Sequence, residues 1–412
     1  MRRRVVITGL GVITSLGEVV DQMWEALCAG KSGVGPIRRW DSSKYPVHFG
    51  GECYNFDVGN YGVDVREAKR MDRFGQFGLA ASVTAVRDSG LDFDKEDRFR
   101  CGVIIGSGIG GIETLEEQNR ILVARGPMRV SPFTVPRLMV NAASGNVSIR
   151  YNINGPNTAV ATACATGSNA IGDAGRFIQH DMADVMIAGG SEAALCELGL
   201  ASFTAARALS TRNDDPQKAS RPWDKTRDGF VMAEGAGVVV LEEYEHAKKR
   251  GARIYAELIG YGMSGDAHHI TAPWEDGRGA VLAMNAAFKD AGITPDSVDY
   301  VNAHGTSTPL GDVAETRAIK TSFGPRAHKV AISSTKSQLG HLLGASGGVE
   351  TVITAMVVHH NIIPPTINLD EPDTECDLDY TPHRARDMRV GFAMSNSFGF
   401  GGHNASLLLK KV

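Results

Sequence analysis

The sequence predicts an α/β fold in which helices cover largely parallel, buried strands. Short apolar runs alternate along the chain with longer segments of helical period, such as 71–89, 167–179 and 279–291. This alternation is typical of sheets whose strands are joined by helices. The runs that we expect to form strands are 5–10, 102–105, 185–188, 237–241, 254–259, 298–301 and 330–332.

A repeat inside the chain is the second observation. Asp88-Ser89-Gly90 closes one helical segment before a strand, and Asp290-Ala291-Gly292 does the same later in the chain. Phe230 and Phe392 each stand before a Gly-broken apolar hairpin. We interpret this order as two similar halves, residues 1–250 and 251–412, with extra material of the first half within 112–151. Chance likeness is the alternative, because Asp-x-Gly is a common end of a helix.

The composition indicates a globular protein with two ordinary domains or one large duplicated unit. Of 412 residues, 42% are hydrophobic and 22% are charged, and the net charge of -4 gives no indication of nucleic-acid binding. Six scattered cysteines without a CxxC pair argue against a disulfide framework or zinc ribbon and favour the reducing cytoplasm. Residues 1–9 read as a first strand, not a signal peptide, and no apolar run of about 20 residues predicts a membrane span.

Cys164 is the first candidate for chemistry. It follows the strand-like run 158–161 directly and precedes a segment of helical period. A cysteine at such a turn lies at the positive end of a helix dipole, which favours the thiolate. A lone cysteine is more often a buried structural residue, so the neighbouring candidates decide the interpretation.

Two histidines follow later strands. His304 comes just after the run 298–301, at the edge where α/β folds bind ligands, and His341 lies beyond 330–332 with Lys336 and Glu350 nearby. Charged groups beside such apolar sequence are costly to bury unless they are paired. Taken alone, each site is as well explained by a buried, hydrogen-bonded histidine and a surface ion pair.

The loop 396–404 contains three glycines, and their backbone N–H groups could face a ligand as an oxyanion hole requires. A plain turn between strands explains the loop equally well. The adjacent pairs His268-His269 and His359-His360 lack a nearby Cys or carboxylate at ligand spacing. We therefore expect no metal site.

Together these residues resemble the thiolase-related condensing enzymes, and specifically the elongating β-ketoacyl-acyl-carrier-protein synthases of type II. The resemblance covers essentially the whole chain. It implies a thiolase-like fold of two duplicated βαβαβαββ halves in a layered αβαβα structure, with the nucleophilic Cys in the first half and two catalytic His in the second. The motifs that carry it are Thr162-Ala163-Cys164-Ala165, His304-Gly305-Thr306-Ser307-Thr308, Lys336 with Gly340-His341, and Gly399-Phe400-Gly401-Gly402.

Residue types separate the relatives within this resemblance. Thiolases would place a second catalytic Cys in the final Gly-rich loop, where this chain has Phe400. Initiating condensing enzymes use Asn where this chain has His341, and a non-catalytic partner subunit would lack Cys164. His403 is a local departure, because some members carry Thr there.

The resemblance implies an acyl-Cys164 intermediate and decarboxylative condensation with a malonyl group. The N–H groups of Cys164 and Phe400 would form the oxyanion hole, and His304 and His341 would donate hydrogen bonds to the enolate. Lys336 and Glu350 would support the histidines, and Thr306 and Thr308 would touch the phosphopantetheine arm. No metal or organic cofactor is implied.

Further implied roles concern the acyl pocket and the partners. Ile109 and Phe400 would line or gate the pocket, and Phe133 would reach it from the partner subunit of a homodimer. A simple core role for Ile109 is equally open. Acidic acyl carrier protein, in its acyl- and malonyl-loaded forms, would dock on a local basic patch. The candidates are Arg66, Lys69, Arg70, Arg129 and Arg207, with a solvated helix face as the alternative.

Two rival functions remain from the sequence. A polyketide-pathway ketosynthase would carry nearly the same residues. The moderate length of the protein, without fused domains, favours fatty acid synthesis. A scaffold subunit without turnover is the second rival. The intact set of Cys164, His304, His341 and Lys336 argues against it.

Overall fold

Ten strands form one continuous sheet in the computed structural model, which describes residues 2–412. The sheet order is β10-β9-β13-β14-β8-β1-β7-β6-β4-β5, and the two halves meet where β1 pairs with β8. Counted outwards from that junction, each half has its first strand, then its fifth, fourth, second and third. The strands are β1 (Val5–Ile13), β4 (Cys101–Gly106), β5 (Asn157–Thr158), β6 (Val185–Glu192), β7 (Gly235–Glu243), β8 (Ala256–Gly265), β9 (Tyr300–Asn302), β10 (Ala331–Ser333), β13 (Phe392–Gly399) and β14 (His403–Lys410).

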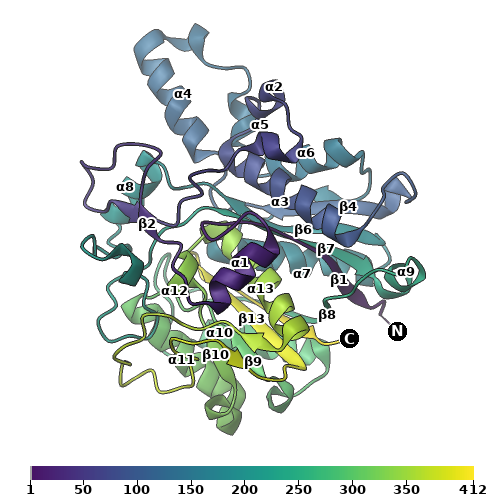
Figure 1. Cartoon of the computed structure of the whole chain (residues 1–412), viewed down its shortest axis with the longest axis vertical. Coiled ribbons are helices and arrows are strands. Elements are labelled where there is room, and N and C mark those ends of the chain that lie inside the picture. Colours follow the sequence, from purple (N-terminus) through teal and green to yellow (C-terminus); the bar gives the residue numbers. More distant parts are fainter. Residues whose placement is uncertain (1) are drawn as a thin grey trace.

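Three helices in each half complete the repeat and give the order βαβαβαββ twice. The first half has α3 (Arg73–Ser89), α6 (Ala142–Tyr151) and α7 (Thr166–Gln179), and the second has α10 (Arg278–Ala291), α11 (Pro309–Phe323) and α13 (Ser346–His360). Helices α7 and α13 pack on each other in the middle, whereas α3 and α6 cover one outer face and α10 and α11 the other (Figure 1). The predicted duplicated, layered α/β fold is therefore confirmed. The division at residue 250, between α9 (Tyr244–Lys249) and β8, stays a prediction.

The Asp-x-Gly markers of the repeat are helix C-caps. Gly90 ends α3 with φ 67°, and Gly292 ends α10 with φ 68°. Both lie in the left-handed region that glycine adopts without strain, and the N–H of Gly90 donates to the carbonyl of Arg87. The same local chemistry stops the equivalent helix in each half.

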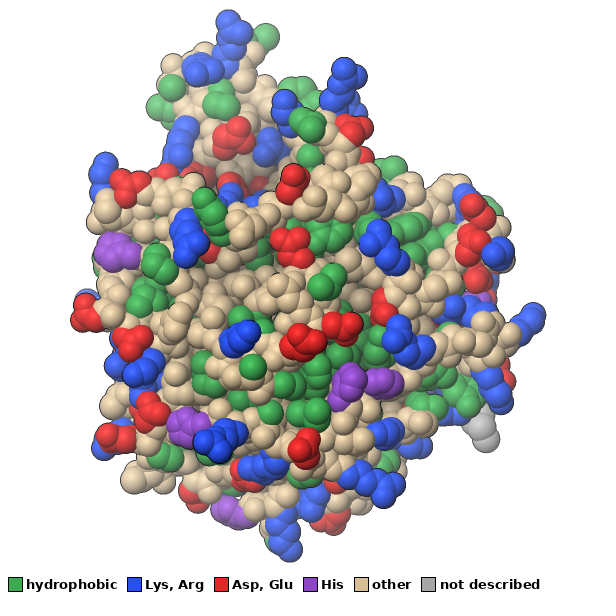
Figure 2. Space-filling view, in the orientation of Figure 1, with side chains coloured by type: hydrophobic (Ala, Val, Ile, Leu, Met, Phe, Trp, Pro, Cys, Tyr) green, Lys and Arg blue, Asp and Glu red, His purple; other side chains and the backbone are tan. Residues whose placement is uncertain are grey.

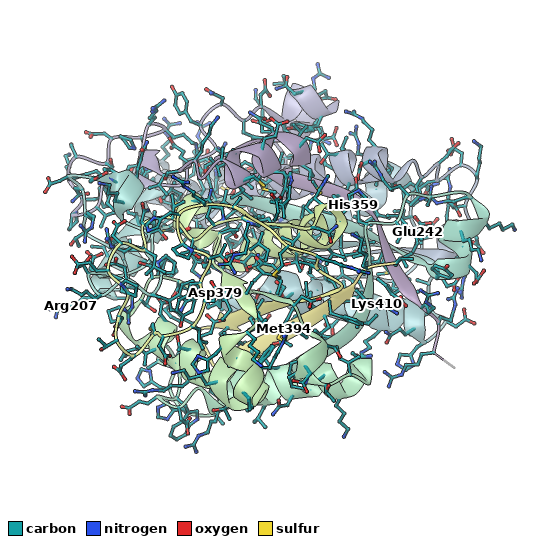
Figure 3. All side chains as sticks on the ribbon, turned by 60° about the horizontal axis from the view of Figure 1, so that its bottom comes forward. Arg207, Glu242, His359, Asp379, Met394 and Lys410 are labelled. Atoms are coloured by element: carbon teal, nitrogen blue, oxygen red, sulfur yellow. The ribbon has the colours of Figure 1, made fainter. Side chains whose placement is uncertain are left out.

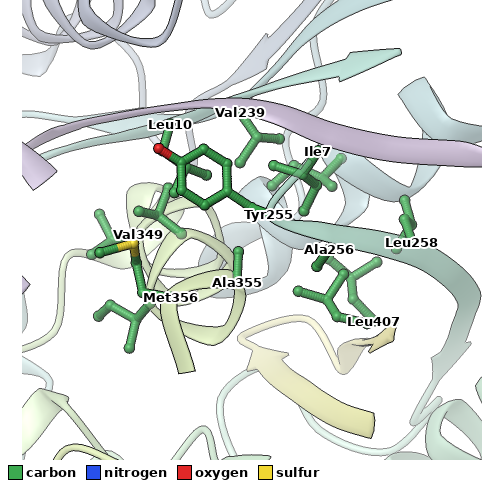
Figure 4. Close-up of a cluster of buried hydrophobic side chains, with 14 of the residues drawn as sticks. Ile7, Leu10, Val239, Tyr255, Ala256, Leu258, Val349, Ala355, Met356 and Leu407 are labelled. Atoms are coloured by element: carbon green, nitrogen blue, oxygen red, sulfur yellow. The ribbon is translucent and has the colours of Figure 1, made fainter. Parts of the chain in front are cut away.

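The central helix α13 is apolar on almost all sides, as expected for a helix covered on every face. Its residues Val349, Ala355 and Met356 pack against side chains from β1, β7, β8 and β14, and all of them are buried (Figure 4). The partners labelled there are Tyr255, just before β8, and the strand residues Ile7, Leu10, Val239, Ala256, Leu258 and Leu407. The core that joins the two halves therefore surrounds the helix that follows His341.

The extra material of the first half lies within the predicted segment 112–151. Helices α4 (Ile112–Arg125) and α5 (Thr134–Leu138) have no counterpart in the second half and project beyond the layers (Figure 1). Helix α6 lies within the predicted 112–151 segment but corresponds to α11, so it belongs to the repeat. The two were not separable in sequence because α6 is short and rich in small residues.

Smaller elements complete the fold: α1 (Val20–Cys28), α2 (Val65–Ala68), α8 (Glu197–Ala205), α12 (Lys336–Leu339) and the strand pairs β2 (Gly35–Pro36) with β3 (Phe49–Gly50) and β11 (Ile362–Ile363) with β12 (Arg386–Asp387). Strand β9 begins two residues later than predicted, because a 3-10 turn at Pro295–Ser297 takes up Val298, whose N–H bonds to Pro295. Among residues 2–412, no helix is long and apolar enough to cross a membrane.

Candidate active site

Cys164 lies in a tight turn that opens α7. It is the middle residue of the 3-10 turn Ala163–Ala165, and Ala163 has φ 49°. The preceding strand β5 ends at Thr158, earlier than predicted, so an irregular segment leads to the turn. Gly399 passes close by: a Cβ there would lie 2.8 Å from the Thr162 carbonyl and 2.9 Å from the Cys164 nitrogen. Only glycine allows the final loop to approach the nucleophile this closely.

The structure brings the three predicted residues of the triad together. His341 Nε2 lies 3.0 Å from Cys164 Sγ, and the rings of His304 and His341 are 5.3 Å apart and almost perpendicular. All three side chains are buried. The two histidines thus face the space in front of the thiol from one side, although they come from separate turns after β9 and β10.

Burial, and not the helix end, sets the acidity of the thiol. Burial raises the pKa of Cys164 to about 12, although the Lys336 charge and the backbone N–H of Phe400 act in the opposite direction. Burial therefore outweighs the lowering of the thiol pKa that we expected from the helix end. The dipole of a helix end contributes a modest stabilisation, whereas desolvation of a fully buried anion is the larger effect.

The two histidines are neutral. Burial holds the pKa of His341 well below its usual range, and the Lys336 charge adds to this. The pKa of His304 is lowered by burial, then by Lys336 and His341. His341 Nδ1 lies 2.9 Å from Ser346 Oγ, and a hydroxyl can serve as donor or acceptor, so His341 can hold its proton on either nitrogen. Its Nε2 can therefore accept the proton of Cys164 or donate to a substrate oxygen.

Lys336 and Glu350 form a buried ion pair behind the histidines. Lys336 starts the short helix α12 and Glu350 lies in α13; their side chains are 2% and 3% exposed and in direct contact. Burial raises the pKa of Glu350 to about 7, against the lowering effect of the Lys336 charge. The Lys336 charge lowers the pKa of both histidines and of the Cys164 thiol, whereas the Glu350 charge raises the pKa of the thiol.

The glycine loop places a backbone donor at the thiol. The N–H of Phe400 points to Cys164, and Gly401 and Gly402 have φ 82° and 74°, so the chain turns back sharply between β13 and β14. The loop is thus both a turn between strands and a candidate oxyanion hole, the two interpretations that the sequence left open.

A cavity of about 460 Å³ opens in front of the triad. The predicted residues that line it are Cys164, His304, His341, Thr306, Thr308, Ile109, Phe400 and Arg207. Thr308 caps α11, and its hydroxyl lies 3.0 Å from that of Thr306. Phe133 is 39% exposed and does not line this cavity, so its role toward a partner subunit stays a prediction.

Sequence reasoning missed several residues of the site. Glu192 and Glu315 line the cavity, and Glu315 accepts hydrogen bonds from the backbone N–H groups of His304 (2.8 Å) and Gly305 (2.7 Å). Burial raises the pKa of Glu315 to about 7. Ser346, which bonds to His341, stands in a run of small residues that gives no sign of this role. The available signal was a carboxylate inside an otherwise apolar strand or helix, a costly placement unless it is satisfied.

The predicted docking cations come from three parts of the first half. Arg66, Lys69 and Arg70 are exposed in and just after α2, and the Arg70 guanidinium lies 5.1 Å from the centre of the Phe133 ring. Arg207 lies instead at the cavity, and Arg129 follows α4. Figure 2 shows Lys and Arg side chains gathered over the end of the molecule where Figure 1 places α2 and α4.

Cys164, His304 and His341 also offer ligand atoms that all lie within 4.8 Å of one another. Thiolate and imidazole are ligands that zinc prefers. An ion held here would occupy the sulfur of the predicted nucleophile, so its binding would compete with the predicted covalent role of Cys164. Metal-independent catalysis stays a prediction.

Two family models match the chain. The model described as "Beta-ketoacyl synthase, N-terminal domain" matches residues 2–247, and "Beta-ketoacyl synthase, C-terminal domain" matches residues 255–370. The chain is 54% identical over 411 residues to the 3-oxoacyl-(acyl-carrier-protein) synthase 2 of Coxiella burnetii, covering 100% of this chain and 99% of that protein. It is 53% identical over 412 residues to the protein of the same name from Vibrio harveyi, with 100% and 99% covered.

Solved structures agree with these matches. A beta-ketoacyl synthase from Burkholderia phymatum has a TM-score of 0.92 and 37% identity, with 100% of both chains covered. A type II polyketide ketosynthase, solved in complex with its acyl-carrier protein, has a TM-score of 0.93 and 35% identity over 100% of both chains.

Proposed function

Because the chain belongs to the beta-ketoacyl synthase family, we propose that it joins an acyl group to a malonyl group, each delivered on acyl carrier protein, in fatty acid elongation. The observation that carries the proposal is the 3.0 Å contact between Cys164 Sγ and His341 Nε2 at the cavity, with His304 alongside. A thiol, a neutral acceptor for its proton and a second neutral imidazole are the groups that the two half-reactions need.

In the first half-reaction, Cys164 attacks the acyl thioester while its proton passes to His341 Nε2. The developing oxyanion accepts hydrogen bonds from the N–H groups of Cys164 and Phe400. The bond from the acyl carbon to the carrier sulfur then breaks, and the carrier thiolate takes the proton from His341. The thiol with a pKa of about 12 makes this proton transfer necessary, because little thiolate is present beforehand.

The second half-reaction needs both imidazoles as donors. The bond between the malonyl carboxylate and its neighbouring carbon breaks, carbon dioxide leaves, and its electron pair forms an enolate whose oxygen accepts hydrogen bonds from His304 and His341. The enolate carbon attacks the acyl-Cys164 thioester, the C–S bond breaks, and the sulfur regains a proton from water. The product is a β-ketoacyl group two carbons longer. Ser346 supports the change of His341 from acceptor to donor, because its hydroxyl can bond to either form of Nδ1.

Other residues hold the substrates. Lys336 and Glu350 position the histidines and set the local field, and Thr306 and Thr308 contact the phosphopantetheine arm at the cavity mouth. Ile109 and Phe400, with Phe133 of a second copy, bound the acyl chain. Carrier protein docks on the cations of α2 with Arg129 and Arg207, which suits an acidic partner.

A homodimer in the cytoplasm is the setting that we propose. Exposed apolar side chains of the first half support association: Val123 is 80% exposed, Met128 92% and Ile149 79%. The edge strand β5 is short and exposed. Its unpaired backbone groups could bond to a strand of a second copy. All six cysteines are free, which suits a reducing compartment.

A polyketide-pathway ketosynthase is the second candidate, favoured by the TM-score of 0.93 to a polyketide ketosynthase. The identity of 54% to a 3-oxoacyl synthase, against 35% to that structure, supports fatty acid elongation instead. A non-catalytic subunit is disfavoured because the thiol, both imidazoles and the ion pair are all in place.

The test uses wild type and Cys164→Ala with hexadecanoyl carrier protein and malonyl carrier protein. Intact-protein mass spectrometry follows the acyl-enzyme, and product analysis follows the β-ketoacyl group. We expect both in wild type and neither in the variant. Product without an adduct on Cys164 would overturn the covalent mechanism, and no product across acyl groups from hexanoyl to hexadecanoyl would overturn the proposed reaction.

A further inference from the structure

The duplicated fold gives the active site a structural counterpart, in which each position comes from the other half of the chain. The 3-10 turn Leu343–Ala345 opens α13 as the turn of Cys164 opens α7, and Leu343 has φ 51° where Ala163 has 49°. Gly344 therefore occupies the position of Cys164. Likewise Gly108 follows the end of β4 by two residues, as His304 follows the end of β9.

A buried carboxylate fills this counterpart. Glu192 ends β6, as Gly399 ends β13, and its side chain is fully buried. It accepts hydrogen bonds from the N–H groups of Gly344 (3.0 Å), Gly108 (2.8 Å) and Ile109 (3.3 Å), and from the Ser107 hydroxyl (2.6 Å). Among residues 2–412, no Lys, Arg or His forms an ion pair with it.

An unpaired buried carboxylate is costly, and four hydrogen bonds offset that cost in this position. Burial raises the pKa of Glu192 even against these donors. The proposed chemistry does not use Glu192, because Cys164, His304 and His341 account for both half-reactions. Because burying this carboxylate is costly and its hydrogen bonds go to the two turns, we look for its role in the position of the Ser107–Gly111 turn.

That turn bounds the cavity. Ser107 to Gly111 carries Ile109, which lines the cavity beside Cys164 and is 37% exposed. Three of its five residues are glycines, and Gly110 has φ 79°. Within the turn, Gly110 N–H bonds to Ser107 Oγ, whose own proton goes to Glu192. Through these hydrogen bonds Glu192 joins the Gly-rich turn Ser107–Gly111 to the turn of Gly344 in the second half.

We propose that Glu192 is a positioning residue for substrate selection: it fixes the Ser107–Gly111 turn against Gly344 and so sets how far Ile109 extends into the acyl pocket. This inference rests on the proposed function, in which the acyl chain enters the cavity. Without the carboxylate, three N–H donors lose their acceptor, the turn loosens, and Ile109 no longer discriminates sharply between short and long chains.

The test compares Glu192→Gln and Glu192→Ala with wild type in the acylation of Cys164 by hexanoyl, dodecanoyl and hexadecanoyl carrier protein, followed by intact mass. We expect the ratio of the fastest to the slowest acyl group to fall about fivefold in Glu192→Ala and less in Glu192→Gln, whose amide oxygen keeps some of the bonds. A general change in thiol reactivity affects every chain alike and cancels in this ratio.

Glu242→Gln is the matched control. Glu242 is a fully buried glutamate on the neighbouring strand β7, bonded to Thr8, His246 and Arg250, and does not line the cavity. Figure 3 shows Glu242 and Arg207, a residue of the cavity, at opposite ends of the molecule. The control should lower the melting temperature and keep the chain-length ratio. Equal ratios in all four proteins would overturn the positioning role.

A second readout does not depend on turnover. Amide hydrogen exchange of peptides covering 107–111 and 343–345 should rise in both Glu192 variants and stay at the wild-type level in Glu242→Gln. If wild type forms no acyl-enzyme, the proposed function fails, and exchange alone then decides whether Glu192 holds the turn. Unchanged exchange in Glu192→Ala would overturn the inference whatever the activity.

Discussion

The turn before α7 and the turn before α13 share a backbone shape but have opposite uses. The first carries Cys164, whose sulfur faces the cavity, and the second carries Gly344, whose N–H is bound by Glu192. A Cβ on Gly344 would lie 2.4 Å from the Gly108 nitrogen and 2.6 Å from a Glu192 oxygen. Duplication supplies two equivalent positions at helix N-termini, and the space around each decides which one can hold a nucleophile.

The turns after β4 and β9 are more alike than the turns before α7 and α13. In both, two successive N–H groups bond to a buried carboxylate: Gly108 and Ile109 to Glu192, and His304 and Gly305 to Glu315. The first turn faces the proposed acyl chain and the second presents a donor to the proposed malonyl group. The same arrangement of two N–H groups on one carboxylate thus holds the proposed steric boundary in one half and a proposed catalytic side chain in the other.

We expect the largest effect when the cysteine is moved from the turn before α7 to the turn before α13. In the double variant Cys164→Gly with Gly344→Cys, we expect condensation to fall at least ~10³-fold, because the new thiol has no room and no imidazole beside it. The single variant Gly344→Cys should lose about 1–3 kcal/mol of unfolding free energy in urea through overpacking. Substantial activity in the double variant would mean that the two turns are interchangeable.

Separate replacement of the two histidines should divide the half-reactions. We expect His304→Ala to form the acyl-enzyme at near the wild-type rate and to lose condensation by ~10²–10⁴-fold. His341→Ala should slow both steps, because the thiol loses the acceptor of its proton. Single-turnover mass spectrometry measures acylation, and carbon dioxide release measures the second step. Equal acylation defects in the two variants would contradict this division of roles.

Removing one partner of the buried Lys336–Glu350 ion pair should lower the unfolding free energy more than replacing both partners with apolar residues. Lys336→Met leaves Glu350 buried without its partner and should lower the unfolding free energy by about 3–5 kcal/mol. Lys336→Met with Glu350→Leu should recover most of that loss but none of the condensation activity. Recovery of activity as well would show that the pair serves packing alone.

The thiol state predicts a pH profile. With the pKa of Cys164 near 12, alkylation by iodoacetamide should accelerate steadily from neutral to alkaline pH without a plateau, measured against Cys164→Ala. Because folding raises this pKa above the value of an unfolded thiol, the folded state holds the proton more tightly. Wild type should therefore lose stability relative to the variant as pH rises from about 9 to about 12. A plateau near pH 7 would indicate a thiolate.

The smallest effect concerns the surface. Reversing one charge, as in Arg66→Glu or Arg70→Glu, should raise KM for acyl carrier protein by about threefold at low salt and by less at high salt. Lys248→Glu on α9 is the control, exposed but on a different part of the first half. Equal shifts in KM for all three variants would point to net charge and not to a docking patch.

Much of the fold was predictable because its signals are local. The Asp-x-Gly ends of α3 and α10 act through the left-handed conformation of one glycine, so they can be read without tertiary contacts. Element boundaries were less predictable: β9 starts late because of a 3-10 turn, and the segment 112–151 did not show where the extra helices end and the repeat resumes, because α6 is short and rich in small residues.

The sequence by itself determined the residue types of the site: a thiol before a helix, two imidazoles after strands, and a lysine and a glutamate beside apolar sequence. The tertiary structure decided their state. It raised the pKa of Cys164 by removing water, brought His341 to Cys164, and placed Glu192 beside Gly344, the counterpart of Cys164. Desolvation and hydrogen bonds between residues far apart in the chain exist only once the two halves have packed together, so no local pattern could have revealed them.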